Sequence, residues 1–205
     1  MYALITDGSI AKIFSGNRGL TIGNIQYPRD IFSKWTEAQR NAIGIFEVIQ
    51  NNAKKKDEAY YTNTNQTFTY DADAGTVTAT YGDATAKAHA DANATDADGN
   101  DLDPVIVIEG LKTIRIRSVK QQAASILQNT DWYIVRKADA GTSVPSAITT
   151  FRAAVRTKAA AMETLITNAS NTPAIETLYT YVNTADEGDP VVMERPLGEF
   201  PVLGS

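Results

Sequence analysis

This chain has few side chains that could act in catalysis or bind a metal, because histidine and cysteine are almost absent. Among 205 residues there is one histidine and no cysteine. Disulfides, thiolate nucleophiles and cysteine-based zinc sites are therefore excluded, and a single histidine does not make a zinc site. His89 lies between Lys87 and Asp91 among alanines. We expect its side chain to be exposed rather than to act as a catalytic base.

The acidic segment of residues 91–103 is the best candidate for binding a metal. Asp96 and Asp98 lead into Gly99, which resembles part of a calcium-binding loop. With Gly99 as the turn glycine, however, the first ligand position falls on Ala94 and the last on Val105. The carboxylates that such a loop requires are missing, so we predict an acidic turn and no metal site. Weak binding of calcium at the surface is left open.

Other catalytic motifs are missing. Gly16-Asn17-Arg18-Gly19 is not followed by the Gly-Lys-Ser/Thr of a phosphate-binding loop, and no Gly-x-Ser-x-Gly motif occurs. We therefore predict no catalytic residues, no cofactor and no enzymatic activity. The net charge of −5 does not favour nucleic acid or an anionic membrane as a partner, and the basic residues after position 110 are interpreted as a solvated helix face. No stretch has the roughly 18 consecutive apolar residues that a membrane span needs.

The first part of the chain has the pattern of β-hairpins. Asp7-Gly8, a strong turn signal, separates strands predicted at residues 3–6 and 9–13. A brief helix is predicted at residues 36–44, with Thr36 and Gln39 in capping-box positions, and a strand at 45–49. A second hairpin is predicted from the alternating residues 66–70 and 76–81. We assign residues 1–85 to a β-rich N-terminal domain.

The second part has a different composition and then a helical periodicity. Residues 82–104 contain almost no large apolar side chain, and we interpret 86–104 as an acidic linker or exposed excursion. Apolar spacing predicts helices at 111–129, from Pro145 onward and at 173–181, with a short connector at 131–134. The domains are thus a helical hairpin domain, 105–184, and an extended C-terminal tail, 185–205. The predicted fold class is α+β.

Several segments resemble one known family in matching order. They are residues 1–8 (MYALITDG), residues 35–48 (WTEAQRNAIGIFEV), residues 124–137 (ASILQNTDWYIVRK) and a proline-initiated helix that carries Arg152 and Arg156. Together they resemble the tail fibre assembly and tail-associated structural proteins of tailed bacteriophages, of the marine or cyanophage type. The resemblance covers about half of the chain and contains no catalytic residue.

The resemblance implies a non-enzymatic structural component of a phage virion, associated with the tail, fibre or baseplate and assembled in the host cytoplasm. Its expected partners are other phage structural proteins, and we expect a homo-oligomer. One alternative is a tail fibre assembly chaperone, and a more distant one is a small calcium-dependent hydrolase. Trp35 and Trp132 are each expected to anchor a core, with an interface role as the alternative. The predicted partner contacts are Trp35, Trp132, Tyr133, Leu197, Phe200 and Val202.

Overall fold

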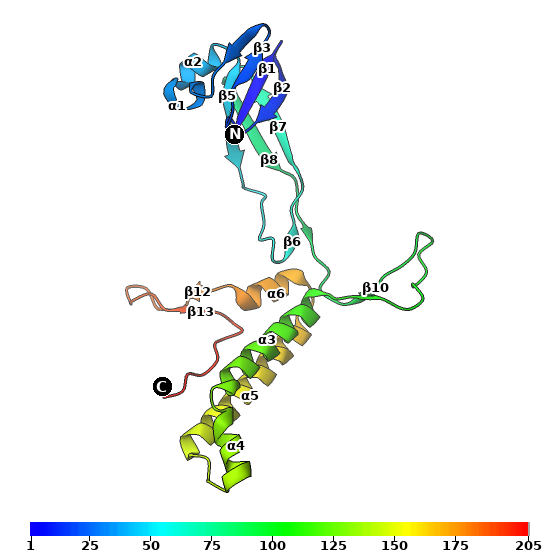
Figure 1. The fold of residues 1–205 in the computed structure, drawn as a ribbon, viewed down its shortest axis with the longest axis vertical. Helices are drawn as coiled ribbons and strands as arrows, with labels where there is room; N and C mark the ends of the chain where they lie inside the picture. The colour runs from blue at the N-terminus through cyan, green and yellow to red at the C-terminus, as the bar shows by residue number, and fades with distance from the viewer. Residues whose placement is uncertain (205) are drawn as a thin grey trace. The chain divides into compact units, whose positions relative to one another are not determined.

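The computed structural model describes residues 1–204, which divide into two compact units. Unit 1 is Met1–Thr85 and unit 2 is Ala86–Ser205. Unit 1 contains a five-stranded sheet, whereas unit 2 contains the four longest helices. The predicted α+β class, with a β-rich first half and a helical second half, is confirmed (Figure 1).

Unit 1 is built on a sheet with the strand order β2-β1-β5-β8-β7. Its strands are β1 (Tyr2–Thr6), β2 (Ser9–Phe14), β5 (Ile45–Asn51), β7 (Gln66–Asp71) and β8 (Thr76–Tyr81). The β1–β2 and β7–β8 pairs are the two predicted hairpins, and Asp7 and Gly8 have the positive φ angles that the first turn requires. The central β5–β8 pair is parallel, which local sequence patterns did not indicate.

Shorter elements lie outside the five-stranded sheet. They are β3 (Leu20–Ile22), β4 (Ile25–Tyr27), α1 (Ile31–Lys34), α2 (Glu37–Asn41), β6 (Tyr61–Thr62) and β9 (Thr85–Ala86). The predicted capping box is present at α2, where the Thr36 hydroxyl accepts from the Gln39 N–H and the Gln39 side chain accepts from the Thr36 N–H. The core under the sheet is small: Ala3, Val48, Val77 and Ala79 are its buried members.

Unit 2 is organised around α3 (Leu111–Gln128) and α5 (Ser146–Asn168), which pack against each other. Between them in sequence lies α4 (Asp131–Ala140), and α6 (Thr172–Tyr179) packs on both. The prediction of a connector at residues 131–134 was wrong, because these residues form the first turn of α4. The apolar residues of α4, 132–135, are consecutive rather than spaced three and four apart, so the spacing that indicated the other helices is missing here, and none of the residues of α4 is buried.

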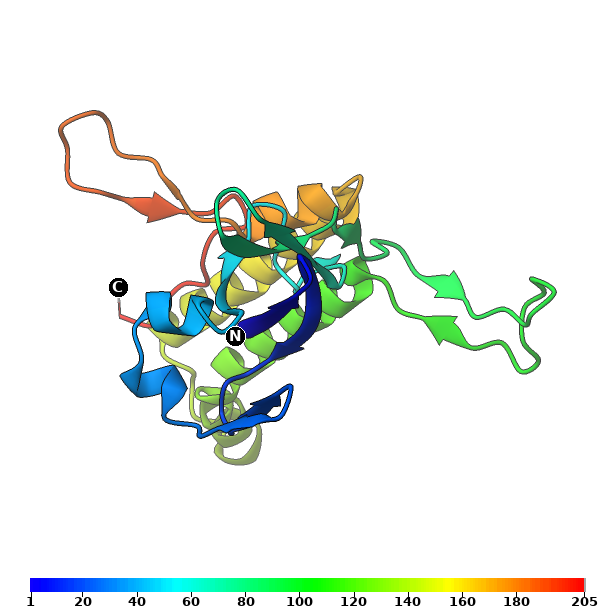
Figure 2. The same ribbon diagram turned by 90° about the horizontal axis from the view of Figure 1, so that it is seen from above.

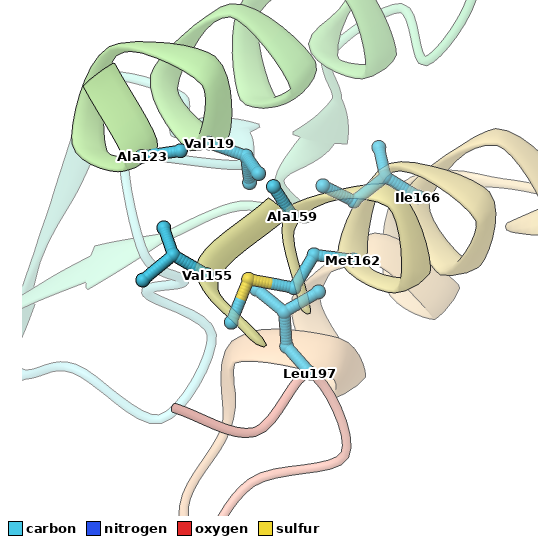
Figure 3. Packing of buried hydrophobic residues seen from close by; sticks show 7 residues of the cluster. All are labelled: Val119, Ala123, Val155, Ala159, Met162, Ile166 and Leu197. Atoms are coloured by element: carbon cyan, nitrogen blue, oxygen red, sulfur yellow. The ribbon is translucent and has the colours of Figure 1, made fainter. Parts of the chain in front are cut away.

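The core of unit 2 joins α3, α5 and the C-terminal tail (Figure 3). Its buried members are Val119, Ala123, Val155, Ala159, Met162, Ile166 and Leu197. Leu197 belongs to the segment predicted to be an extended tail, yet its side chain is 2% exposed and its N–H donates to the Leu178 carbonyl at 3.0 Å. The tail therefore completes the core of its own chain around Leu197.

Two short antiparallel pairs leave the helices of unit 2. The first, arm 1 (residues 92–108), contains β10 (Ala92–Asn93) and β11 (Val107–Ile108). The second, arm 2 (residues 181–194), contains β12 (Val182–Asn183) and β13 (Met193–Glu194). In Figure 2 both extend away from the helices as isolated ribbons, arm 1 in green and arm 2 in orange to red. An isolated two-stranded hairpin is marginally stable in water.

Candidate protein interface

Arm 1 carries a run of apolar side chains that no element of unit 2, as far as residue 204, covers. Val105, Ile106, Val107 and Ile108 are each more than half exposed, at 58, 53, 54 and 57%. Successive residues of an extended chain point to opposite faces, so both faces of this strand are uncovered. Exposed apolar side chains that are contiguous, rather than scattered, are typical of protein interaction sites. The run is the strongest indication of an interface in unit 2.

The root of arm 1 is held firmly at the N-terminus of α3. Asp91 Oδ1 accepts a hydrogen bond from the Gly110 N–H at 2.8 Å, and Asp91 Oδ2 accepts one from the Thr113 hydroxyl at 2.9 Å. The N–H of Leu111 donates to the Ala88 carbonyl at 2.9 Å. The hydrogen bonds from the Gly110 N–H and then from the Thr113 hydroxyl hold the pKa of Asp91 below 3.8, the ordinary value for an aspartate.

Gly110 is required at this root because the two chain segments are in close contact there. A Cβ atom added to Gly110 would lie 2.3 Å from the carbonyl carbon and oxygen of Ala90. Any larger residue would push the two segments apart. The tight packing and the Asp91 hydrogen bonds together fix the direction in which arm 1 leaves the helices.

The tip of arm 1 is an acidic turn, as predicted. Asp96 Oδ1 accepts hydrogen bonds from the N–H groups of Asp98 and Asn100, both at 2.9 Å. The bond from Asn100 is the main cause of a lowered pKa at Asp96. Within residues 1–204 no group of three or more His, Asp or Glu side chains is placed to hold a metal ion.

Arm 2 repeats the pattern of arm 1. Its exposed apolar side chains are Tyr181, Val182, Val191, Val192 and Met193, which are 47 to 71% exposed. The Tyr181 hydroxyl donates to Glu199, and the Arg195 guanidinium lies over the Tyr181 ring at 5.2 Å. The hydrogen bond to Glu199 is the main cause of a raised pKa at Tyr181. Arm 2 is thus fastened at one end, while its valines remain in solvent.

Helix α4 presents a third apolar surface. Trp132, Ile134 and Val135 are 51, 43 and 65% exposed. The Trp132 and Tyr133 rings lie 3.8 Å apart between centroids, and the Arg136 guanidinium sits 4.7 Å from the Trp132 ring centre. An aromatic pair with an arginine is the residue composition that is enriched at interface hot spots.

Arg152 of α5 fixes α4 relative to α3. Its Nη1 donates to the Leu127 carbonyl at 2.8 Å and to the Thr130 hydroxyl at 2.7 Å, and lies 2.8 Å from Asp131 Oδ1. Thr130 is 2% exposed and the Arg152 side chain is 13% exposed. A nearly buried guanidinium therefore joins three helices at the point where α4 begins.

The predicted contact residues fall into different environments. Trp35, in unit 1, is half-buried with its ring edge-to-face on Tyr27 at 6.0 Å. Trp132 was expected to anchor a core. It does not, because half of it is exposed. Tyr133 is half-buried beside it. His89, expected to be exposed, is half-buried as well.

The predicted contacts of the C-terminal tail also separate. Leu197, which was predicted to contact a partner, is buried in the core of unit 2. Phe200 packs against the same core, whereas Val202 is 70% exposed beside the first turns of α5. The structure brings Trp132 and Tyr133 together on α4, and it brings Leu197 and Phe200 together at the core of unit 2. The predicted contact residues of unit 2 therefore do not form one site.

Sequence reasoning missed both arms as apolar surfaces. Residues 105–108 are an unbroken β-branched run, which is a strand signal, but the helical periodicity that follows led us to extend the helical domain over them. Val191 and Val192 were likewise not recognised as part of a strand pair, because the segment around them is rich in proline, glycine and charged residues. The β-branched run was the signal by which arm 1 could have been found.

Charge is segregated among the elements of unit 2. Arms 1 and 2 each contain four acidic residues and no lysine or arginine. The helical residues 111–168 contain nine basic and three acidic residues. Several of these basic groups already have partners in the chain, including Arg117 with Glu109 and Lys120 with Glu163.

The described part of the chain offers little else that resembles a ligand site. An open hollow in unit 1 is lined by residues of β2, β3, β4 and the intervening loop, among them Lys12, Phe14 and Arg18. No helix in residues 1–204 is long and apolar enough to cross a membrane. In comparisons with known proteins, no family model matches the chain, and no curated protein and no solved structure is similar to it.

Proposed function

We propose that this chain is a non-enzymatic structural component of a tailed-phage virion, associated with the tail, fibre or baseplate, that acts through protein–protein contacts. The observation that carries the protein-contact part is the uncovered apolar run of arm 1, residues 105–108. The virion part rests on the resemblance of residues 1–8, 35–48 and 124–137 to tail-associated proteins.

Three surfaces of unit 2 support a role in assembly. Arm 1, arm 2 and α4 expose apolar side chains together, although the chain has enough buried residues to form a core without them. Leaving such surfaces in water is unfavourable, at about 25 cal/mol per Å² of apolar area. A permanent partner that covers them removes this cost, which is how obligate interfaces are stabilised.

Mass spectrometry of purified particles tests the proposal. Phage that encodes this chain is purified by density gradient, and the amount of the chain per particle is measured against the major tail proteins. We expect a fixed, stoichiometric amount that survives a high-salt wash. Presence in the infected-cell lysate but absence from particles would overturn the structural role and identify a tail fibre assembly chaperone instead.

A further inference from the structure

The helices of unit 2 do not cover the apolar run of arm 1. Its root is fixed by Asp91, Gly110 and Leu111 at the N-terminus of α3, and the arm leaves the helices from there (Figures 1 and 2). Helix α4 follows the other end of α3, which has 18 residues and is therefore about 27 Å long. The uncovered side chains of arm 1 and of α4 thus belong to opposite ends of one helix.

Charge discriminates between the surfaces that could cover arm 1. Arms 1 and 2 are both acidic without a single basic residue, so pairing of arm with arm would bring like charges together. The helical residues 111–168, in contrast, carry an excess of basic residues. Helix α4 itself carries two acidic and two basic residues. Asp131 pairs with Arg152, whereas Arg136 and Lys137 form no ion pair with any residue of 1–204, and Asp139 is the remaining acidic residue. With Asp131 paired, the surface of α4 is apolar with one positive charge in excess, and it is therefore complementary to an acidic arm that carries an apolar strand.

We propose that arm 1 of one copy of this chain packs on α4 of a second copy, where residues 105–108 cover Trp132, Ile134 and Val135. The acidic tip around Asp96 and Asp98 then lies near Arg136 and Lys137 of the other copy. This proposal deepens the proposed function, on which it rests, by naming the partner of two of its surfaces. Because the two surfaces differ, the contact produces a reciprocal dimer, a ring or, where the rotation between copies does not close, an open filament.

The first experiment measures self-association of the full chain by size-exclusion chromatography with light scattering, over a range of concentrations. An arm variant, Ile106→Ser with Ile108→Ser, and an α4 variant, Trp132→Ser with Val135→Ser, are each expected to weaken association at least about tenfold, which corresponds to about 1.4 kcal/mol. The matched control is Ile25→Ser with Ile49→Ser, since these side chains of unit 1 are 59 and 53% exposed. The control should associate as the parent chain does.

A mixing experiment separates this arrangement from pairing of arms. The arm variant retains an intact α4 and the α4 variant retains an intact arm, so an equimolar mixture contains pairs with one intact contact. We expect the mixture to show a larger mean mass than either variant alone. None of the four substituted residues is buried, so we expect each variant to keep the helical fold. Circular dichroism and thermal unfolding verify this.

Three results would overturn the proposal. These are a parent chain that stays monomeric at about 100 μM, an α4 variant that associates like the parent, and a mixture that gains no mass over its components. They are distinguishable from failure of the proposed function, because a monomeric chain found stoichiometrically in particles would refute the contact between copies and leave the virion role intact.

Discussion

Arg152 shows how one side chain can determine where a surface is displayed. Its guanidinium satisfies the Leu127 carbonyl and the Thr130 hydroxyl, both at the end of α3, and pairs with Asp131 at the start of α4. Since Thr130 is buried, no water can replace the arginine there without rearrangement. The aromatic surface of α4 therefore depends on a residue of another helix.

Replacing Arg152 should destabilise unit 2. We expect Arg152→Ala to lower the free energy of unfolding by about 2 to 3 kcal/mol, because hydrogen bonds to a charged group are lost and their buried acceptors are left unsatisfied. Urea unfolding followed by circular dichroism measures this. Arg156→Ala, one turn further along α5 and exposed, is the control and should change stability by less than about 0.5 kcal/mol. Equal losses in both variants would contradict the role given to Arg152.

Asp91 connects the root of arm 1 to pH. Its pKa is lowered in the folded chain by the Gly110 N–H and then by the Thr113 hydroxyl, so the ionised form is favoured by folding. The resulting stabilisation is present above the unfolded pKa, near 3.8, and is lost as the pH falls through the lower folded value. The root of arm 1 should therefore loosen only in acid, below about pH 4.

An NMR titration tests this prediction for Asp91. We expect its carboxyl resonance to titrate with a midpoint below 3.8, accompanied by a shift of the Gly110 amide. Thr113→Val removes one of the two donors and should raise the midpoint, while the Gly110 amide shift remains. A midpoint at or above the ordinary value in the parent chain would show that the carboxylate is not held as described.

At the scale of the element, the two arms differ from the strands of the main sheet. The strands of the main sheet are five to seven residues long and belong to a five-stranded sheet. In each arm, by contrast, the two strands have only two residues each and pair only with each other. Arm 1 adds bonds from the Ala94 N–H to Ile106 and from the Leu102 N–H to Ala94. Such a small ladder opens easily, which lowers the free energy of local opening for its amides.

Hydrogen exchange should reveal this difference. In dilute solution the amides of arm 1 should exchange much faster than those of α5, whose core residues Val155 and Ile166 are fully buried. At higher concentration, where the proposed contact forms, arm 1 and α4 should both gain protection and α5 should not change. Exchange monitored by mass spectrometry at two concentrations measures this. Protection of arm 1 that is already complete in dilute solution would show that the arm is stable alone.

At the scale of the whole molecule, each of the two units has a hydrophobic core of its own. One lies among Ala3, Val48, Val77 and Ala79 of unit 1, and the other joins α3, α5 and Leu197 of unit 2. Each core draws its buried residues from one unit only. Separate cores are the condition for separate folding units.

Unit 1 is therefore expected to fold by itself. A fragment of residues 1–85 should give a dispersed amide NMR spectrum and a cooperative thermal transition. It is a small domain with a modest core, so we expect a stability below about 5 kcal/mol. A fragment ending at residue 75 lacks β8, which contributes Val77 and Ala79, and serves as the unfolded control. Loss of structure in the longer fragment would show that its core is insufficient.

The sequence by itself determined those elements whose signals are local. Asp7-Gly8 specified a hairpin, Thr36 with Gln39 specified the start of α2, and apolar spacing specified α3 and α5. Each of these depends on atoms a few residues apart along the chain, so a short window of sequence contains the physical cause. The α+β class follows from the same local patterns.

Only the tertiary structure decided which apolar residues are covered. Leu197 is buried because α5 and α6 come together beneath the tail, and the residues of β11 are exposed because within unit 2, as far as residue 204, only β10 pairs with them. Val107 and Val155 are the same amino acid, yet one is 54% exposed and the other 0%. Burial depends on distant segments of the chain, and hydrophobicity alone does not encode their positions. The candidate interface therefore became visible only once the fold placed those segments.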